Sequence, residues 1–186
     1  MAHIALNSEE PGILGLLKYR PETAVPLTEL AEVLLRGPST LTRGERELIG
    51  AYVSELNKCQ FCASSHAAFA AAQLPDGMRL VDQVLADPVT APVTEKLRAL
   101  LAIAASVQQS GLRVTPGQVA AARDAGATDL EIHDCVLIAA AFCMMNRYVD
   151  GLGTTTFDDP AMYAIGAELI VENGYVSLPA VETQSG

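Results

Sequence analysis

The chain has 186 residues, of which 50% are hydrophobic and 18% are charged, a composition that excludes extended disorder and predicts one packed domain without a disulfide framework. The formal net charge of −10 argues against a nucleic-acid-binding protein, because phosphate binding requires clustered Lys and Arg. With so few charges to cover its surface, the chain is expected to bury further apolar area between the subunits of a homo-oligomer.

No segment of the sequence indicates a membrane protein. Residues 1–10 lack the basic and apolar segments of a secretory signal. The longest strongly apolar run, residues 136–145, is too short to cross a bilayer, which takes roughly 20 residues, and predicts a core helix. We therefore expect a cytoplasmic protein. Its four cysteines then indicate redox or metal chemistry, since structural disulfides are rare in that compartment.

The first half of the sequence predicts helices after an irregular N-terminal arm. Residues 11–15 combine proline and glycine, which favours a turn. Apolar spacing predicts a first helix from Thr28 to the Gly-Pro pair after residue 36. Thr42 and the glutamate three residues later form a capping box that opens the next helix. The alanine-rich segment 59–73 continues as a helix until a Pro-Asp-Gly turn.

The second half continues in the same way and sets the fold class. We expect a short tail after the last helix, which ends at residue 172, to be disordered. No segment alternates with period two, so the class is all-α. Segments 42–56 and 94–108 share a threonine start and an apolar run, which hints at a diverged helical repeat within a single domain covering residues 1–186. The core motif region of this domain is 41–73, its C-terminal helices span 92–172, and the individual helices are expected at 78–85, 92–110, 116–125, 129–149 and 160–172.

The segment Cys59-Gln-Phe-Cys62-Ala-Ser-Ser-His66 carries the clearest chemistry. The two cysteines and the histidine lie at i, i+3 and i+7, on one face of a helix. Cysteines at this spacing can close a disulfide, and a helix N-terminus lowers the pKa of a thiol. His66 is placed to take the proton from Cys62. The pattern therefore predicts dithiol redox chemistry.

Two other interpretations of these cysteines stay open. The pair could fill core space as small hydrophobes, although a buried histidine at this spacing would then lack a reason. A zinc site would need further ligands, which His133 and Cys135 could supply only through the fold. Cys135 and Cys143 lie on the apolar helix and are expected in the core. A thioredoxin-like site would need strands, which the sequence does not predict.

Two glutamates compete for the role of base beside the thiols. Glu47 lies opposite the apolar face of its helix, next to small residues that would let another helix approach it. The alternative interpretation is that the Glu47 side chain is exposed to solvent. Glu55 precedes Cys59 by four residues and would share its face if the helix were continuous. A polar cluster near residue 150, Asn146, Arg147 and Asp150, is expected to be structural.

The segment from Glu47 to His66 resembles the core motif of the AhpD-like, carboxymuconolactone decarboxylase superfamily. The flanking segments Leu41-Thr-Arg-Gly-Glu-Arg-Glu47 and Asn146-Arg-Tyr-Val-Asp150-Gly-Leu-Gly153 look like the branch described as peroxidase-related proteins. This resemblance extends over most of the chain.

The resemblance implies an all-helical fold that assembles as trimers or hexamers, with no cofactor and no metal. It implies a reactive pair, Cys59 and Cys62, assisted by Glu47 and His66. Cys62 would be the thiolate, and Cys59 would exchange disulfides with a partner. One departure from the pattern is Phe61, where the characterised peroxidase of the superfamily has a histidine.

These observations together predict a thiol-dependent alkyl hydroperoxidase or disulfide oxidoreductase. Its partners would be a small-molecule hydroperoxide and a thiol or disulfide reductant protein, with neither nucleic acid nor membrane. The first alternative is a lactone decarboxylase-type acid-base enzyme on the same fold, which has no need of the cysteine pair. The second is a noncatalytic thiol redox sensor, in which the disulfide changes an interface.

Overall fold

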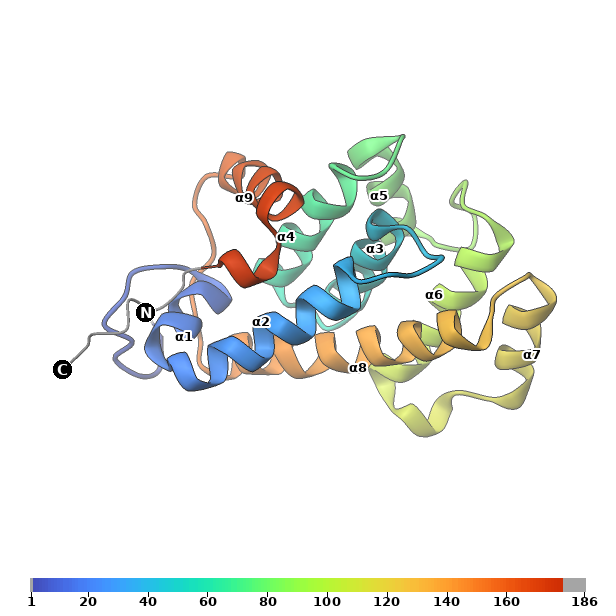
Figure 1. The fold of residues 1–186 in the computed structure, drawn as a ribbon, viewed down its shortest axis with the longest axis horizontal. Coiled ribbons are helices and arrows are strands. Elements are labelled where there is room, and N and C mark those ends of the chain that lie inside the picture. Colours follow the sequence, from blue (N-terminus) through green and yellow to red (C-terminus); the bar gives the residue numbers. More distant parts are fainter. Residues whose placement is uncertain (1, 179–186) are drawn as a thin grey trace.

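The computed structural model describes residues 2–178 and consists there of helices joined by short loops (Figure 1). No strand occurs among these residues, which confirms the all-α prediction. The elements are α1 (Gly12–Tyr19), α2 (Pro21–Arg36), α3 (Arg43–Leu56), α4 (Gln60–Ala71), α5 (Gly77–Ala86), α6 (Glu95–Gln109), α7 (Pro116–Asp124), α8 (Asp129–Gly151) and α9 (Ala161–Asn173), with short 3₁₀ helices η1 (Gly111–Arg113) and η2 (Tyr175–Ser177).

The N-terminal part is more helical than its sequence predicts. Helix α1 occupies most of the expected irregular arm, and α2 begins at Pro21 rather than at Thr28. Gly12 starts α1 with a φ of +57°, a conformation that glycine adopts without strain. Pro21 stands at the first position of α2, where its missing N–H costs no helical hydrogen bond. Pro26 is accommodated inside the same helix. Neither proline therefore shifts the start of α2 to a later residue.

The chain after α9 also differs from the prediction of a disordered tail. Gly174, with a φ of +78°, ends α9, and η2 follows directly. Tyr175 in η2 is buried with only 5% of its surface exposed. Ordered backbone thus continues beyond residue 172, while the expected disorder of 179–186 lies outside the described residues.

Helix α3 is the central element of the fold. It is buried along most of its length, and it contacts α4, α6 and α8. Gly50 allows α8 to come close, because a Cβ atom at this position would lie 2.3 Å from the ring of Phe142. The small residues beside Glu47 therefore do admit a neighbouring helix, as their pattern predicts.

Helix α8 packs along α3 and α6, contacts α2, and extends over much of the length of the molecule (Figure 1). Among the described residues it alone is long and apolar enough, by length and composition, to cross a bilayer. A core helix of a globular protein meets the same test. Its residues Ile138, Ala139 and Phe142 are buried against the other helices, in agreement with the core helix predicted for residues 136–145.

Threonine caps begin several of these helices and confirm the predicted capping boxes. Thr42 and Thr128 each accept a hydrogen bond from the backbone N–H three residues on, and the glutamate at that position bonds back to the cap. Thr94 caps α6 through its hydroxyl. Each such exchange satisfies backbone donors that the first helical turn leaves free.

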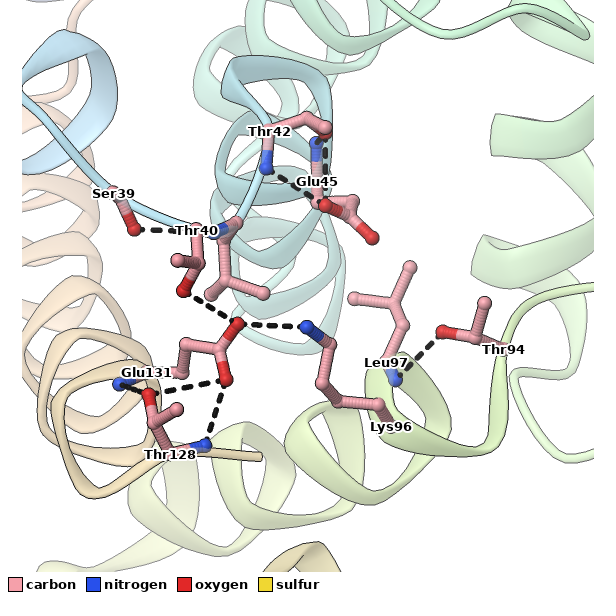
Figure 2. Close-up of polar contacts among 10 residues, drawn as sticks. Ser39, Thr40, Thr42, Glu45, Thr94, Lys96, Leu97, Thr128 and Glu131 are labelled. Atoms are coloured by element: carbon pink, nitrogen blue, oxygen red, sulfur yellow. Dashed lines mark hydrogen bonds and ion pairs between the residues drawn. The ribbon is translucent and has the colours of Figure 1, made fainter. Parts of the chain in front are cut away.

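Glu131 does more than cap α8, because it joins the starts of three helices (Figure 2). Its carboxylate accepts hydrogen bonds from the Thr40 hydroxyl at 2.8 Å, the Lys96 ammonium at 2.7 Å and the Thr128 backbone N–H at 2.7 Å. Burial alone would raise the pKa of Glu131, but these donors outweigh burial and lower it to about 2. The ionised carboxylate therefore stabilises the fold.

We expect Glu131→Gln to lower the free energy of unfolding at neutral pH by about 1.5–3 kcal/mol, the usual contribution of a hydrogen bond to a charged group. Because the pKa of Glu131 is lower in the folded chain than its ordinary value of 4.5, its contribution is complete above pH 4.5 and is lost as the pH falls towards 2. Denaturant unfolding across this range should therefore show a shallower acid dependence in the variant. The matched control is Glu95→Gln, whose side chain is 81% exposed; an equal effect there would contradict the assignment.

Candidate redox site

A sharp corner between α3 and α4 places the two cysteines. Helix α3 ends at Leu56, and Lys58 adopts a φ of +62°, which turns the chain before α4. Cys59 is the N-cap residue of α4, and Cys62 lies in its first turn. Both side chains are buried, with exposed fractions of 0% and 5%. The corner thus brings both sulfurs to the positive end of a helix, where a thiolate is favoured.

The pKa values of the two thiols are shifted in opposite directions. The pKa of Cys62 lies below its ordinary value, first because of a side-chain hydrogen bond with Cys59 and then because of the charge of His66 and a hydrogen bond with Asn146; burial opposes the shift. The same bond with Cys62, together with burial, raises the pKa of Cys59. Cys62 is therefore the thiol of the pair that ionises more readily, and Cys59 is the one that holds its proton more firmly.

Glu47 and His66 form a hydrogen-bonded pair behind Cys62. Glu47 Oε2 lies 2.7 Å from His66 Nδ1, and the glutamate side chain is fully buried. The imidazole is held edge-on by Phe142 and Phe69, with ring centroids 4.5 and 5.1 Å away. Because a carboxylate accepts hydrogen bonds, Nδ1 carries the hydrogen of this contact, and Nε2 is the nitrogen at which His66 could exchange a proton with a thiol.

Tyr175 belongs to the same cluster, although the sequence did not point to it. Its hydroxyl donates a hydrogen bond of 2.6 Å to Glu47 Oε1, and its ring stacks on His66 with centroids 6.2 Å apart. The residue lies in the segment expected to be a disordered tail. Its one sequence signal is the glycine at 174, a common helix-ending residue, followed by a large aromatic side chain.

Asn146 is a second site neighbour that sequence reasoning assigned only to a structural cluster. It is 1% exposed, and its amide donates to the Ser54 hydroxyl at 3.0 Å and accepts from Asn57 at 2.8 Å. A buried amide on an apolar helix requires such partners. Arg147, in contrast, donates to the carbonyl of Cys143 rather than pairing with Asp150.

The cavity in front of Cys62 and His66 is apolar. It has a volume of about 420 Å³ and lies between α1, α2, α4, α8 and α9. Apolar residues such as Leu14, Leu30 and Met145 form most of the wall, and neither Lys nor Arg is among the described residues that line it. The lining residues with polar side chains are Glu10, Thr28, Cys62, Ser65, His66, Tyr163 and Tyr175. A small apolar molecule with one reactive polar group suits this space.

Phe61, the departure from the family pattern, is a packing residue. Its ring lies against Gly12, where a Cβ atom would come within 2.2 Å of it. It also contacts the rings of Phe157 and Tyr163, with centroids 5.7 and 6.1 Å away. A histidine in this position would bring a polar ring into an apolar cluster. The contact between Phe61 and Gly12 packs the start of α1 against α4.

The remaining candidates lie apart from the dithiol. Glu55 pairs with Lys58 at 3.0 Å and is partly exposed, because the corner interrupts the helix that would have aligned it with Cys59. Cys135 lies in the main core, where burial raises its pKa to about 12. Cys143 is half-buried. Exposed His133 bonds to Asp134, and no group of three His, Cys, Asp or Glu side chains within residues 2–178 is placed to hold a metal ion.

The family profile for the carboxymuconolactone decarboxylase family matches residues 21–74 and 75–156. The chain belongs to this family. The two threonine-capped helices of the predicted repeat fall in different matched segments. Helix α3 lies in the first segment and α6 in the second. Comparison with curated proteins finds no match.

Two crystal structures share the fold. One is an uncharacterized peroxidase-related protein from Silicibacter sp. TM1040, with a TM-score of 0.74 and 26% identity over 83% of this chain and 78% of that one. The other is described as an alkylhydroperoxidase AhpD core, an uncharacterized peroxidase-related protein from Ralstonia eutropha JMP134, with a TM-score of 0.75 and 26% identity over 84% and 81% of the two chains. These likenesses confirm the predicted AhpD-like superfamily.

The contrast between the thiols predicts selective alkylation. In the reduced protein we expect Cys62 to react with iodoacetamide below pH 8.5, about the ordinary pKa of a thiol, because its thiolate is stabilised. Cys59 and Cys135 should react slowly, since their pKa values are raised. Mass mapping of the alkylated residues at graded pH measures this. Uniform reaction of all cysteines with a midpoint near 8.5 would exclude an activated Cys62.

Proposed function

We propose that this chain is a thiol-dependent peroxidase that reduces organic hydroperoxides through Cys62 and Cys59. The observation that carries the proposal is the position of Cys62. This thiol lines an apolar cavity, its pKa is lowered, and it is hydrogen-bonded to a second free thiol, Cys59. The peroxidase-related description of the two similar structures supports the same chemistry. Membership of the family does not by itself decide between a peroxidase and a lactone decarboxylase-type enzyme.

The proposed reaction begins with transfer of the Cys62 proton to His66. The thiolate attacks the terminal oxygen of the hydroperoxide, so that an S–O bond forms, the O–O bond breaks, and the alkoxide takes the proton from His66 as it leaves. Cys59 then attacks the sulfenic acid of Cys62, which forms the disulfide and releases water. A dithiol reductant restores both thiols, and it supplies the two electrons that the peroxide consumed.

Glu47 would support the first step as a partner of the histidine. An ionised carboxylate 2.7 Å from Nδ1 stabilises the imidazolium that forms when His66 accepts a proton. Asn146 would stabilise the thiolate directly by hydrogen bonding to Cys62. Glu47 would therefore stabilise the protonated His66, and Asn146 would stabilise the Cys62 thiolate. Both favour transfer of the proton from Cys62 to His66.

The wall of the cavity favours a neutral organic hydroperoxide. Its space of about 420 Å³ lies within the usual size range of small-molecule sites. A substrate bearing carboxylates, such as a decarboxylase requires, would need cationic groups, and the described lining residues include neither Lys nor Arg. The cavity therefore favours the peroxidase over the lactone decarboxylase alternative.

The surroundings of the site support further proposals about partners. Met162, Ile165 and Leu169 on α9 are partly exposed apolar residues, which is consistent with a homo-oligomer, proposed as a trimer or hexamer. The physiological reductant is proposed to be a cytoplasmic thiol or disulfide protein that exchanges with Cys59. Light scattering of the purified protein tests the oligomer directly.

We expect the wild type to consume cumene hydroperoxide in steady state with dithiothreitol as reductant, and Cys62→Ser to abolish this turnover. Cys59→Ser should still oxidise once at Cys62 but fail to form the intramolecular disulfide. Peptide mapping after peroxide treatment should find Cys59 joined to Cys62 in the wild type, with Cys135 and Cys143 reduced. Disulfide formation without steady-state consumption would instead identify a noncatalytic redox sensor.

We expect Glu47→Gln to reduce peroxide turnover by about 10²- to 10⁴-fold, the usual range for a proton-transfer group, because the amide cannot stabilise the imidazolium of His66. Glu55→Gln is the matched control, since this residue pairs with Lys58 at the surface, and its turnover should stay close to that of the wild type. Circular dichroism and light scattering establish that both variants keep fold and assembly. Equal, small losses would remove Glu47 from the mechanism.

A further inference from the structure

We propose that Tyr175 is a positioning residue of the thiol site, whose hydroxyl orients the Glu47 carboxylate for its hydrogen bond with His66. The proposal rests on the proposed function in one respect, because it takes Cys62 as the activated thiol. It adds a residue from the C-terminal end of the described chain to a site otherwise formed by α3, α4 and α8.

The geometry divides the two oxygens of Glu47 between two partners. Oε1 accepts from the Tyr175 hydroxyl at 2.6 Å, and Oε2 lies 2.7 Å from His66 Nδ1. Since Glu47 is 0% exposed, water does not replace a missing donor, and a buried carboxylate with an unsatisfied oxygen is costly. The Tyr175 hydroxyl therefore satisfies Oε1 and fixes the orientation of the Glu47 side chain while Oε2 contacts the histidine.

The hydroxyl is suited to act only as a donor. Burial, followed by the charge of Glu47, raises the pKa of Tyr175 well above its ordinary value, so the phenol keeps its proton throughout the range in which a peroxidase works. The same hydroxyl lies 3.5 Å from His66 Nδ1, a weaker contact than the one to Glu47. Tyr175 thus stabilises the carboxylate and does not compete for the proton of the imidazole.

A dedicated set of contacts from α2 holds Tyr175 in place. Its backbone N–H donates to Glu32 Oε2 at 2.8 Å. Arg36, paired with Glu32 at 3.0 Å, donates to the carbonyls of Ile170 and Val171 at 2.8 and 3.1 Å. The Ile170 carbonyl also accepts from the Gly174 N–H, so Arg36 is its second donor. The Val171 carbonyl is one of those that the last turn of α9 leaves for partners outside the helix. The chain after α9 is therefore tied to α2 at the point where it delivers the tyrosine to Glu47.

The test compares Tyr175→Phe with Tyr52→Phe in the reduced full-length protein. Tyr175→Phe keeps the ring beside His66 and removes the donor alone. Tyr52 is a buried tyrosine of α3 that does not line the cavity, so its variant controls for loss of a phenolic hydroxyl from the core. The readouts are the rate of Cys62 alkylation by iodoacetamide between pH 5 and pH 9 and, separately, the pH profile of cumene hydroperoxide turnover.

We expect Tyr175→Phe to lower the alkylation rate of Cys62 near neutral pH by about 10-fold, within the range for loss of a residue that supports a functional group from behind. The acid limb of both profiles should move to higher pH, because the ionised form of Glu47 loses one of its two donors. Tyr52→Phe should retain the profiles of the wild type. A residue that only filled space would leave Tyr175→Phe unchanged in rate and profile, and that result would overturn the proposal.

A second variant keeps the result decisive if Tyr175→Phe is poorly folded, as judged by thermal melting. Glu32→Ala removes the acceptor of the Tyr175 backbone N–H without touching Glu47, and it should move the acid limb in the same direction. An unchanged limb in this folded variant would count against the proposal. Absence of peroxide turnover in the wild type would refute the proposed function alone, because the alkylation profile reports on Tyr175 without any peroxide.

Discussion

A carboxylate buried at the centre of an apolar helical bundle is the constraint on which this structure depends. Glu47 has no exposed surface, so its charge must be satisfied by protein donors alone. These donors come from His66 on α4 and from Tyr175 after α9. Three distant segments of the chain must therefore meet around α3. The contacts that satisfy the charge also bring the histidine towards the thiols, so folding and site assembly share one requirement.

The two cysteines show how a small local difference produces unlike chemistry. They are three residues apart on the same short segment, but Cys59 caps α4 and Cys62 lies inside its first turn. The hydrogen bond between them lowers the pKa of one and raises that of the other. An isolated buried thiol, such as Cys135, only becomes harder to ionise. The asymmetry within the pair therefore comes first from the hydrogen bond between the two thiols, and His66 adds to it at Cys62.

Local sequence signals predicted the elements well because their causes are local. The threonine capping boxes at residues 42 and 128 fix helix starts through bonds within one turn, and spacing alone placed Cys62 and His66 on one helix. The competition between Glu47 and Glu55 depended on whether the helix continues, and a left-handed residue at 58 interrupts it. Lysine carries no strong preference for that conformation, so the corner could not be predicted from the residue type at this position.

Long-range parts of the site could not be predicted in this way. The hydrogen bond from Tyr175 to Glu47 joins residues 128 positions apart, and no periodicity encodes such a pair. Asn146 was visible as a polar residue on an apolar helix, which predicts buried partners without naming them. The early start of α2 was missed because Pro21 and Pro26 resemble loop signals until the helix position of each is known.

The close approach of α3 and α8 has a consequence for how this sequence can change over time. The ring of Phe142 occupies the space that a Cβ at residue 50 would need, and the same ring supports the edge of His66. A larger residue at position 50 fits only beside a smaller one at 142, and that replacement would loosen the imidazole. The two positions should therefore vary together among related chains, and glycine should persist at 50 wherever an aromatic ring holds the histidine.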